Sequence, residues 1–123
     1  MMKLKVINEE FSVCKVEDYT GIDISQQWVF TGSTDEEKSL VCPISLVPIN
    51  TIEREDEWRA FRIEGVLEFS LIGILSKIST LLADAGIGIF AVSTYNTDYI
   101  FLKEERLEAA LSALSEAGYI IAV

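Results

Sequence analysis

The chain has 123 residues, half of which are hydrophobic, and a formal net charge of −10. This length suits one ordinary domain or two very small ones, and the hydrophobic content is sufficient for a sizeable core. The Lys and Arg residues form no run, and the negative charge would repel phosphate backbones and anionic lipid, so neither nucleic acid nor a membrane surface is an expected partner.

The residue inventory excludes several kinds of chemistry. Histidine is absent, which removes His-dependent nucleophile activation and imidazole metal ligands. Cys14 and Cys42 alone cannot form a structural zinc site, and we expect them as buried thiols of a reduced cytosolic protein, with a disulfide or redox pair as the alternative. We expect no secretory leader, because the residues at the start form no apolar h-region. The sequence has no apolar run of about 20 residues and no Gly-rich phosphate-binding motif, so no membrane span, metal or cofactor is expected.

The first half of the chain predicts about three strands and one short helix. Alternating apolar residues predict a half-buried strand at 11–16, and aromatic and β-branched residues predict a second strand at 27–31. Thr34 and Glu37 fit a capping box, so Thr34 is the predicted N-cap of a helix of one or two turns. A third strand is predicted at 40–42.

Residues 44–57 are predicted to be a linker between two parts of the chain. They contain a proline and a run of charged residues, and this composition interrupts regular structure. We therefore place a boundary near residue 50. The predicted division is an N-terminal subdomain at 1–52 and a C-terminal domain at 53–123.

The second half of the chain shows stronger periodicity. Residues 58–64 alternate between apolar and polar, which predicts a strand. From Ile72 to Ala85 the apolar residues recur with the spacing of an amphipathic helix, and Gly86 takes the position that follows a helix C-terminus. The full order is strand, helix, strand, strand, helix, strand, at residues 58–64, 72–85, 87–92, 99–102, 104–117 and 119–123.

This order predicts an α+β fold class with a ferredoxin-like βαββαβ unit in the C-terminal half, in which two helices cover one face of a four-stranded antiparallel sheet. The N-terminal half is interpreted as a degenerate copy of the same unit. The predicted strand at 87–92 is apolar on both faces. A small sheet rarely buries both faces internally, so we expect a partner surface and hence a homodimer or higher homo-oligomer.

A polar hinge between the strands at 87–92 and 99–102 is the main candidate site. Hydroxyl, amide and carboxylate groups in such a hinge are typical either of a small-ligand contact or of a demanding turn, in which Asn tolerates left-handed backbone and Asp bonds the local chain. Both interpretations stay open at this point. The hinge residues are Ser93, Thr94, Tyr95, Asn96, Thr97 and Asp98.

Several segments of the chain resemble an ACT domain. The most specific is the hinge run S-T-Y-N-T-D, and the segments around Trp58, Gly73 and Gly86 fit as well. The similarity extends over nearly the whole chain and is strongest at 57–105. It is to the tandem ACT subgroup of the CASTOR-type arginine sensors, which is related to the regulatory domains of aspartate kinases.

The resemblance implies a free amino acid bound at an interface between paired ACT units, between the loop before the first helix and the hinge. Backbone N–H groups at a helix start favour a carboxylate, and Gly73 would let a ligand approach the backbone closely. Helix capping and tight packing are the alternative explanation of this loop. The loop residues of the expected site are Glu68, Phe69, Ser70, Leu71, Ile72 and Gly73.

Three functions follow from these observations. The leading hypothesis is a non-catalytic, cytoplasmic, allosteric regulatory protein that binds an amino acid, whose identity the resemblance does not imply. The alternative is a protein-interaction module that has kept the ACT shape and lost the ligand. A small enzyme is the least favoured, because no activated nucleophile, metal cluster or cofactor loop is visible.

Overall fold

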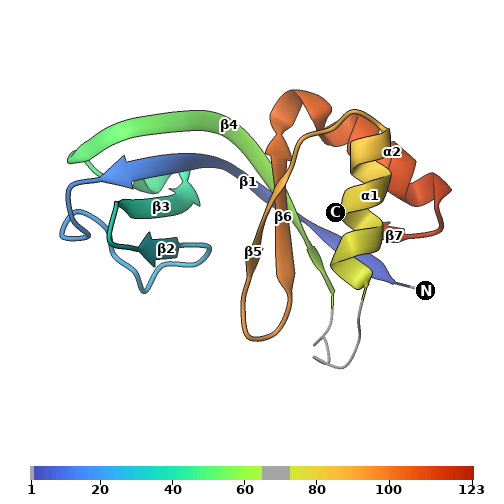
Figure 1. Ribbon diagram of the computed structural model, residues 1–123, viewed down its shortest axis with the longest axis horizontal. Helices are drawn as coiled ribbons and strands as arrows, with labels where there is room; N and C mark the ends of the chain where they lie inside the picture. The colour runs from blue at the N-terminus through green and yellow to red at the C-terminus, as the bar shows by residue number, and fades with distance from the viewer. Residues whose placement is uncertain (1, 65–72) are drawn as a thin grey trace. The chain divides into compact units, whose positions relative to one another are not determined.

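The computed structural model describes residues 2–64 and 73–123, and its chain divides into two compact units (Figure 1). Unit 1 contains Met1–Asn8 and Arg59–Val123, whereas unit 2 contains Glu9–Trp58. Two long strands, β1 (Lys3–Val16) and β4 (Thr51–Ile63), each contribute residues to both units. Each unit is therefore described by itself.

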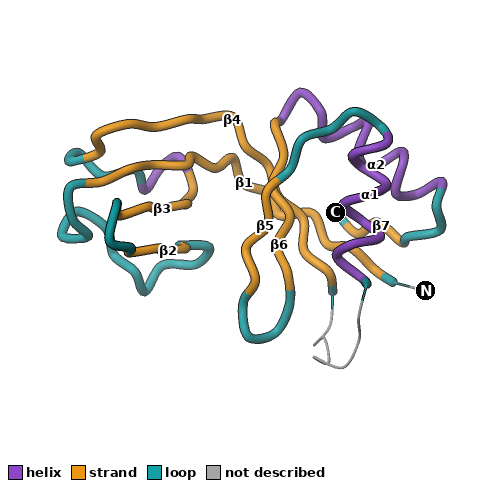
Figure 2. Tube along the Cα trace, viewed as in Figure 1, coloured by secondary structure: helices purple, strands orange, loops and turns teal. Residues whose placement is uncertain are grey.

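Unit 1 combines two α-helices with a sheet. In the strand order β4 lies between β1 and β6; β5 pairs antiparallel with β6, and β7 pairs parallel with the start of β1. Figure 2 shows the same elements coloured by type. After β4 the elements are α1 (Ile74–Asp84), β5 (Phe90–Ser93), β6 (Asp98–Lys103), the 3₁₀ turn η2 (Glu104–Arg106), α2 (Leu107–Glu116) and β7 (Ile120–Ala122).

The core of unit 1 forms because apolar residues alternate along the strands and recur at helical spacing in α1 and α2. Both helices pack against the same strand face, which consists of alternate residues of β1, β4 and β6. Burial of these side chains removes apolar surface from water, which is the main favourable term in folding. The buried set is Leu4, Val6, Phe61, Ile63, Ile78, Leu82, Ile87, Ile100, Leu102, Ala110 and Leu114.

The end of α1 agrees with the prediction that Gly86 follows the helix. Gly86 has a φ of 76°, in the left-handed region that favours glycine. The Ile87 N–H donates to the Leu82 carbonyl at 2.9 Å, and the Gly86 N–H donates to the Ala83 carbonyl at 2.9 Å. These bonds close the helix in a Schellman-type arrangement.

Unit 2 contains β2 (Phe30–Ser33), β3 (Lys38–Pro43) and the 3₁₀ turn η1 (Ile44–Leu46) besides its parts of β1 and β4. Strand β3 pairs antiparallel with both β1 and β2. Its small core includes Cys14 and Cys42, which are buried free thiols as expected. All residues of unit 2 are described, and none of them lies in an α-helix.

Two predictions for unit 2 are wrong. Thr34 and Glu37 do not begin a helix: the Thr34 N–H donates to the Glu37 carbonyl at 2.9 Å, and residues 34–37 form the turn between β2 and β3. The charged run of the predicted linker is also regular structure, because it lies within β4, on residues that are mostly exposed, whereas residues 47–50 of the linker lie outside helices and strands. The predicted strand at 27–31 begins only at Phe30.

The α+β class is confirmed: the sheet is mostly antiparallel, and the described part of the chain contains two α-helices. No helix among the described residues is long and apolar enough to cross a membrane.

Candidate functional site

The candidate site is built on the hairpin that joins β5 to β6. Ser93 pairs with Asp98 across the hairpin, and the Thr94 N–H donates to the Thr97 carbonyl at 2.8 Å. The Thr94 hydroxyl supports the same turn, because its Oγ1 accepts a hydrogen bond from the Thr97 N–H at 3.3 Å. The Ser93 hydroxyl donates to the Asp98 carboxylate at 2.5 Å. Several polar side chains of the predicted hinge therefore form hydrogen bonds that stabilise the turn.

A buried hydroxyl fixes this hairpin to the end of β4. Thr97 is only 7% exposed, and its Oγ1 donates to the Ile63 carbonyl at 2.7 Å. A buried polar group of this kind is costly unless it is paired. The bond therefore holds the turn next to the last residues of β4.

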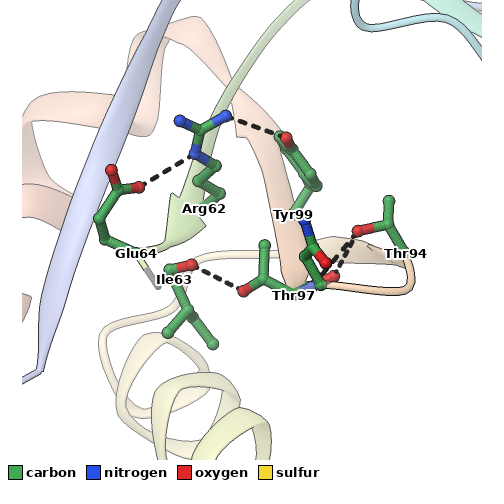
Figure 3. Close-up of a pocket in the computed structure, with 7 residues that line it drawn as sticks. Arg62, Ile63, Glu64, Thr94, Thr97 and Tyr99 are labelled. Atoms are coloured by element: carbon green, nitrogen blue, oxygen red, sulfur yellow. Dashed lines mark hydrogen bonds and ion pairs between the residues drawn. The ribbon is translucent and has the colours of Figure 1, made fainter. Parts of the chain in front are cut away.

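A cavity of about 280 Å³ lies between the turn and the end of β4 (Figure 3). Its wall combines polar and apolar surface, and the lining residues carry hydroxyl, amide, guanidinium and carboxylate groups. The residues that line it are Arg62, Ile63, Glu64, Thr94, Asn96, Thr97 and Tyr99.

Arg62 carries the positive charge of the cavity. Its Nε donates to Glu64 Oε2 at 3.1 Å, and its Nη1 donates to the Tyr99 hydroxyl at 3.1 Å. These bonds, first the one with Tyr99 and then the one with Glu64, raise the pKa of the Arg62 guanidinium above its usual value. Within the described part of the chain Nη2 of Arg62 donates no hydrogen bond.

The cavity thus offers both a cation and a carboxylate to an occupant. The Arg62 and Glu64 side chains are 32% and 37% exposed, so both charges are accessible to a ligand from water. A guanidinium binds carboxylates well, and a carboxylate accepts hydrogen bonds from ammonium groups. The arrangement suits a small zwitterion with one group of each sign.

The structure brings some of the predicted hinge residues to this cavity and leaves others outside. Thr94, Asn96 and Thr97 line it. Ser93 and Asp98 are not among the lining residues and are bonded to each other.

Tyr95 and Gly73 are the other predicted site residues that the structure describes, and neither lines the cavity. Tyr95, at the tip of the turn, is 84% exposed and does not line the cavity. Gly73 precedes α1 with a φ of 83°. The predicted loop residues Glu68, Phe69, Ser70, Leu71 and Ile72 lie outside the described residues.

Sequence reasoning missed four lining residues, namely Arg62, Ile63, Glu64 and Tyr99. A usable signal exists at the end of β4, where Arg62 in the strand and Glu64 directly after it flank the buried Ile63; alternation then places the two charged side chains on the face opposite to that of Ile63. Among the described residues no group of three or more His, Cys, Asp or Glu side chains could hold a metal ion.

The family to which the chain belongs follows from comparison with known proteins. The family model for the ACT domain matches residues 53–116, which is more than half of the chain, and these residues include the whole cavity. The chain therefore belongs to the ACT domain family. No curated protein matches the sequence.

Solved structures show the same fold over nearly the whole chain. A protein from Agrobacterium tumefaciens is 28% identical with a TM-score of 0.86, covering 98% of this chain and 91% of that protein. A Vibrio cholerae protein of unknown function is 21% identical with a TM-score of 0.73, covering 94% and 88%. The regulatory subunit of aspartate kinase from Thermus thermophilus is 12% identical with a TM-score of 0.60, covering 94% and 96%. The last two likenesses are of fold alone.

Proposed function

We propose that the chain is a non-catalytic regulatory protein that binds a free amino acid at an interface between ACT units. The observation that carries this proposal is the cavity between the β5–β6 turn and the end of β4, in which Arg62 and Glu64 present opposite charges side by side. The fold likeness to a regulatory subunit of aspartate kinase supports the regulatory part.

The cavity fits the size and chemistry of a free amino acid. Its volume of about 280 Å³ lies just below the roughly 300–1,000 Å³ of sites for drug-sized ligands. Arg62 Nη2 would hold the α-carboxylate, and the carboxylate of Glu64 would accept hydrogen bonds from the ammonium group. In the proposal the segment from Glu68 to Gly73 and the hinge residues from Ser93 to Asp98 complete the site when ACT units pair.

Pairing of units is the second part of the proposal. Strand β5 stands at the end of the strand order of unit 1, and a strand in that position offers backbone groups to another chain. The proposed assembly is a cytoplasmic homodimer or higher homo-oligomer in which C-terminal ferredoxin-like units meet. Sedimentation at micromolar concentration tests it, and a monomer alone would contradict it.

The N-terminal half belongs to the proposal as well. We interpret it as a degenerate ACT-like copy, which would give the tandem arrangement expected of the CASTOR-type subgroup. The residues of β2, β3 and η1 in unit 2 follow the same order as β5, β6 and η2 in unit 1.

A thermal-shift panel of the common amino acids on the full chain tests the binding proposal. We expect one or a few of them to raise the melting temperature, because a ligand that binds only the folded state stabilises it. In the Arg62→Met variant the affinity should fall about 10- to 100-fold, the equivalent of one lost charged hydrogen bond. A flat panel on well-folded protein would contradict amino-acid binding.

Arg54→Met is the matched control for this experiment. Arg54 also bonds a carboxylate two residues further along the chain, that of Asp56, at 3.0 Å, but it does not line the unit 1 cavity. Its substitution should leave the response to the amino acid unchanged. Equal losses in both variants would show that the effect of Arg62→Met is not specific to the cavity.

One observation favours the alternative of an interaction module without a ligand. The hydroxyls of Thr94 and Thr97 and the Asp98 carboxylate are all engaged in bonds within the protein. If the hinge residues serve only to form the turn, no amino acid will raise the melting temperature of the protein. The Asp98→Ala substitution will then change only its stability or its association.

A further inference from the structure

The hairpin of unit 2 repeats the hairpin of the candidate site 60 residues earlier in the chain. Strands β2 and β3 pair Phe30 with Val41 and Ser33 with Lys38, and β5 and β6 pair Phe90 with Phe101 and Ser93 with Asp98. Each of these residues in the β5–β6 hairpin has a number 60 higher than its counterpart in the β2–β3 hairpin. The 3₁₀ turns that follow, Ile44–Leu46 and Glu104–Arg106, keep the same spacing, and both hairpins can be followed in Figure 2.

The repeat extends to the hydrogen bonds of the turns. The Thr34 N–H donates to the Glu37 carbonyl at 2.9 Å, as the Thr94 N–H does to the Thr97 carbonyl at 2.8 Å. Thr34 Oγ1 accepts from the Glu37 N–H at 3.2 Å, and Thr94 Oγ1 accepts from the Thr97 N–H at 3.3 Å. The two turns are therefore built alike, atom by atom.

The strand end that faces each hairpin also repeats. Lys15 and Val16 end β1 and are followed by Glu17, as Arg62 and Ile63 end β4 and are followed by Glu64, so the order of basic, buried apolar and acidic side chains is the same. Val16 is 3% exposed and Ile63 is 0% exposed. Because side chains alternate along a strand, the charged pair flanking each buried residue faces the other side.

Unit 2 has a cavity at the repeated place, with a volume of about 260 Å³. Six residues that line the unit 1 cavity have their counterparts here. At the strand ends, Arg62, Ile63 and Glu64 correspond to Lys15, Val16 and Glu17. In the turns, Thr94, Asn96 and Thr97 correspond to Thr34, Glu36 and Glu37. Asp35, Lys38 and Ile52 complete the wall.

We propose that this unit 2 cavity is a second amino-acid site, one that prefers a side chain carrying an amino group. The inference rests on the proposed function of the unit 1 cavity. Lys15 would bind the α-carboxylate and Glu17 the α-ammonium, in the roles of Arg62 and Glu64. The preference for a basic side chain follows from the positions at which the two walls differ.

The charge of the two walls differs because neutral residues of unit 1 are replaced by acids. Asn96 and Thr97 have Glu36 and Glu37 as counterparts. The unit 1 wall has one basic and one acidic side chain, whereas the unit 2 wall has two basic and four acidic ones, a net of −2. An additional ammonium group on the ligand would therefore be attracted to unit 2.

Calorimetric titration of the full chain with lysine and with norleucine, which lacks the side-chain amino group, tests the proposal. In Arg62→Met protein, where the affinity of the unit 1 cavity should be about 10- to 100-fold lower, lysine should still bind tightly at one molecule per chain and norleucine should not. Adding Glu36→Gln and Glu37→Gln should lower the affinity for lysine about 10-fold, since exposed ion pairs contribute only modestly to the free energy of binding. Both glutamates are exposed, so these substitutions should leave the fold intact, which circular dichroism would verify.

The outcomes separate this inference from the proposed function. If wild-type protein binds an amino acid and Arg62→Met abolishes all binding, the second site is refuted and the first stands. If lysine alone binds, unaffected by Arg62→Met and weakened by the glutamine substitutions, the second site stands and the first is refuted. If folded wild-type protein binds neither probe nor any other amino acid, both are refuted.

Discussion

Replacing Thr97 by valine should destabilise the protein, because it deletes the bond that joins the β5–β6 turn to β4. Thr97 is 7% exposed, and its hydroxyl donates to the Ile63 carbonyl at 2.7 Å. Valine keeps the branched shape and the strand preference of threonine but offers no donor. The carbonyl of Ile63 then loses this partner in a buried place.

The expected loss in the free energy of unfolding is about 1–2 kcal/mol, the net worth of one buried hydrogen bond plus part of the cost of an unsatisfied carbonyl. For a chain of 123 residues such a loss lowers the melting temperature by about 3–8 °C. Urea unfolding followed by circular dichroism measures it, and an unchanged m-value would show that the denatured state is unaffected.

Thr31→Val is the control for this experiment. Thr31 lies exposed on β2, so the same chemical change there should alter the free energy of unfolding by no more than about 0.5 kcal/mol. The reasoning about Thr97 would be refuted if Thr97→Val were as stable as the wild type, or if both variants lost stability equally.

Three further predictions concern a helix end and a buried thiol. Gly86→Ala should cost about 1–2 kcal/mol, because the φ of 76° strains a residue with a Cβ, whereas Gly88→Ala, whose Cβ meets nothing within 4 Å, should be nearly neutral in the same urea titration. Burial, followed by the neighbouring Cys14, raises the pKa of the Cys42 thiol to about 12. Iodoacetamide should therefore alkylate Cys42 in folded protein at pH 8 about 1000-fold more slowly than an ordinary cysteine. Since this pKa is raised on folding, the contribution of the thiol to stability should be fully present below pH 9 and should be lost between about pH 9 and 12. Rapid labelling at pH 8, or a free energy of unfolding that does not change between about pH 9 and 12, would contradict the burial argument.

Periodicity was sufficient to predict the helices of unit 1, because their apolar stripes are the surfaces that pack in the core. Ile78 and Leu82 of α1 and Leu114 of α2 are fully buried, as the helical spacing requires. Gly86 could be predicted for the same reason, since its conformation is a local requirement of the helix end. Such features depend on residues close together in the chain.

The errors in unit 2 arise where one local pattern is compatible with two structures. Thr34 accepts hydrogen bonds from the Glu36 and Glu37 N–H groups, both at 3.2 Å, as a helix cap would. The chain then returns as β3 because Ser33 pairs with Lys38 across the hairpin. Charged residues at 53–57 similarly describe an exposed strand as well as a linker. Long-range pairing decides both cases, and short-range patterns do not contain it.

The candidate cavity could be predicted only in part for the same reason. The hinge was recognisable because its polar residues are consecutive, and Thr94, Asn96 and Thr97 do line the cavity. Arg62 and Tyr99 are separated by 37 residues and meet only through the folded sheet. Their contact required the register of the strands.

The sharing of β1 between the two units means that the family match does not coincide with a separable piece of the protein. A fragment cut to residues 53–116 would lack the first strand, whose Leu4 and Val6 are buried in the core of unit 1, as well as β7, which pairs with that strand. Cutting or fusing the chain at residue 53 would therefore expose hydrophobic core residues of unit 1 and would not give an independently folded domain. Gene duplication and recombination must carry the N-terminal segment along with the C-terminal unit for that unit to stay folded.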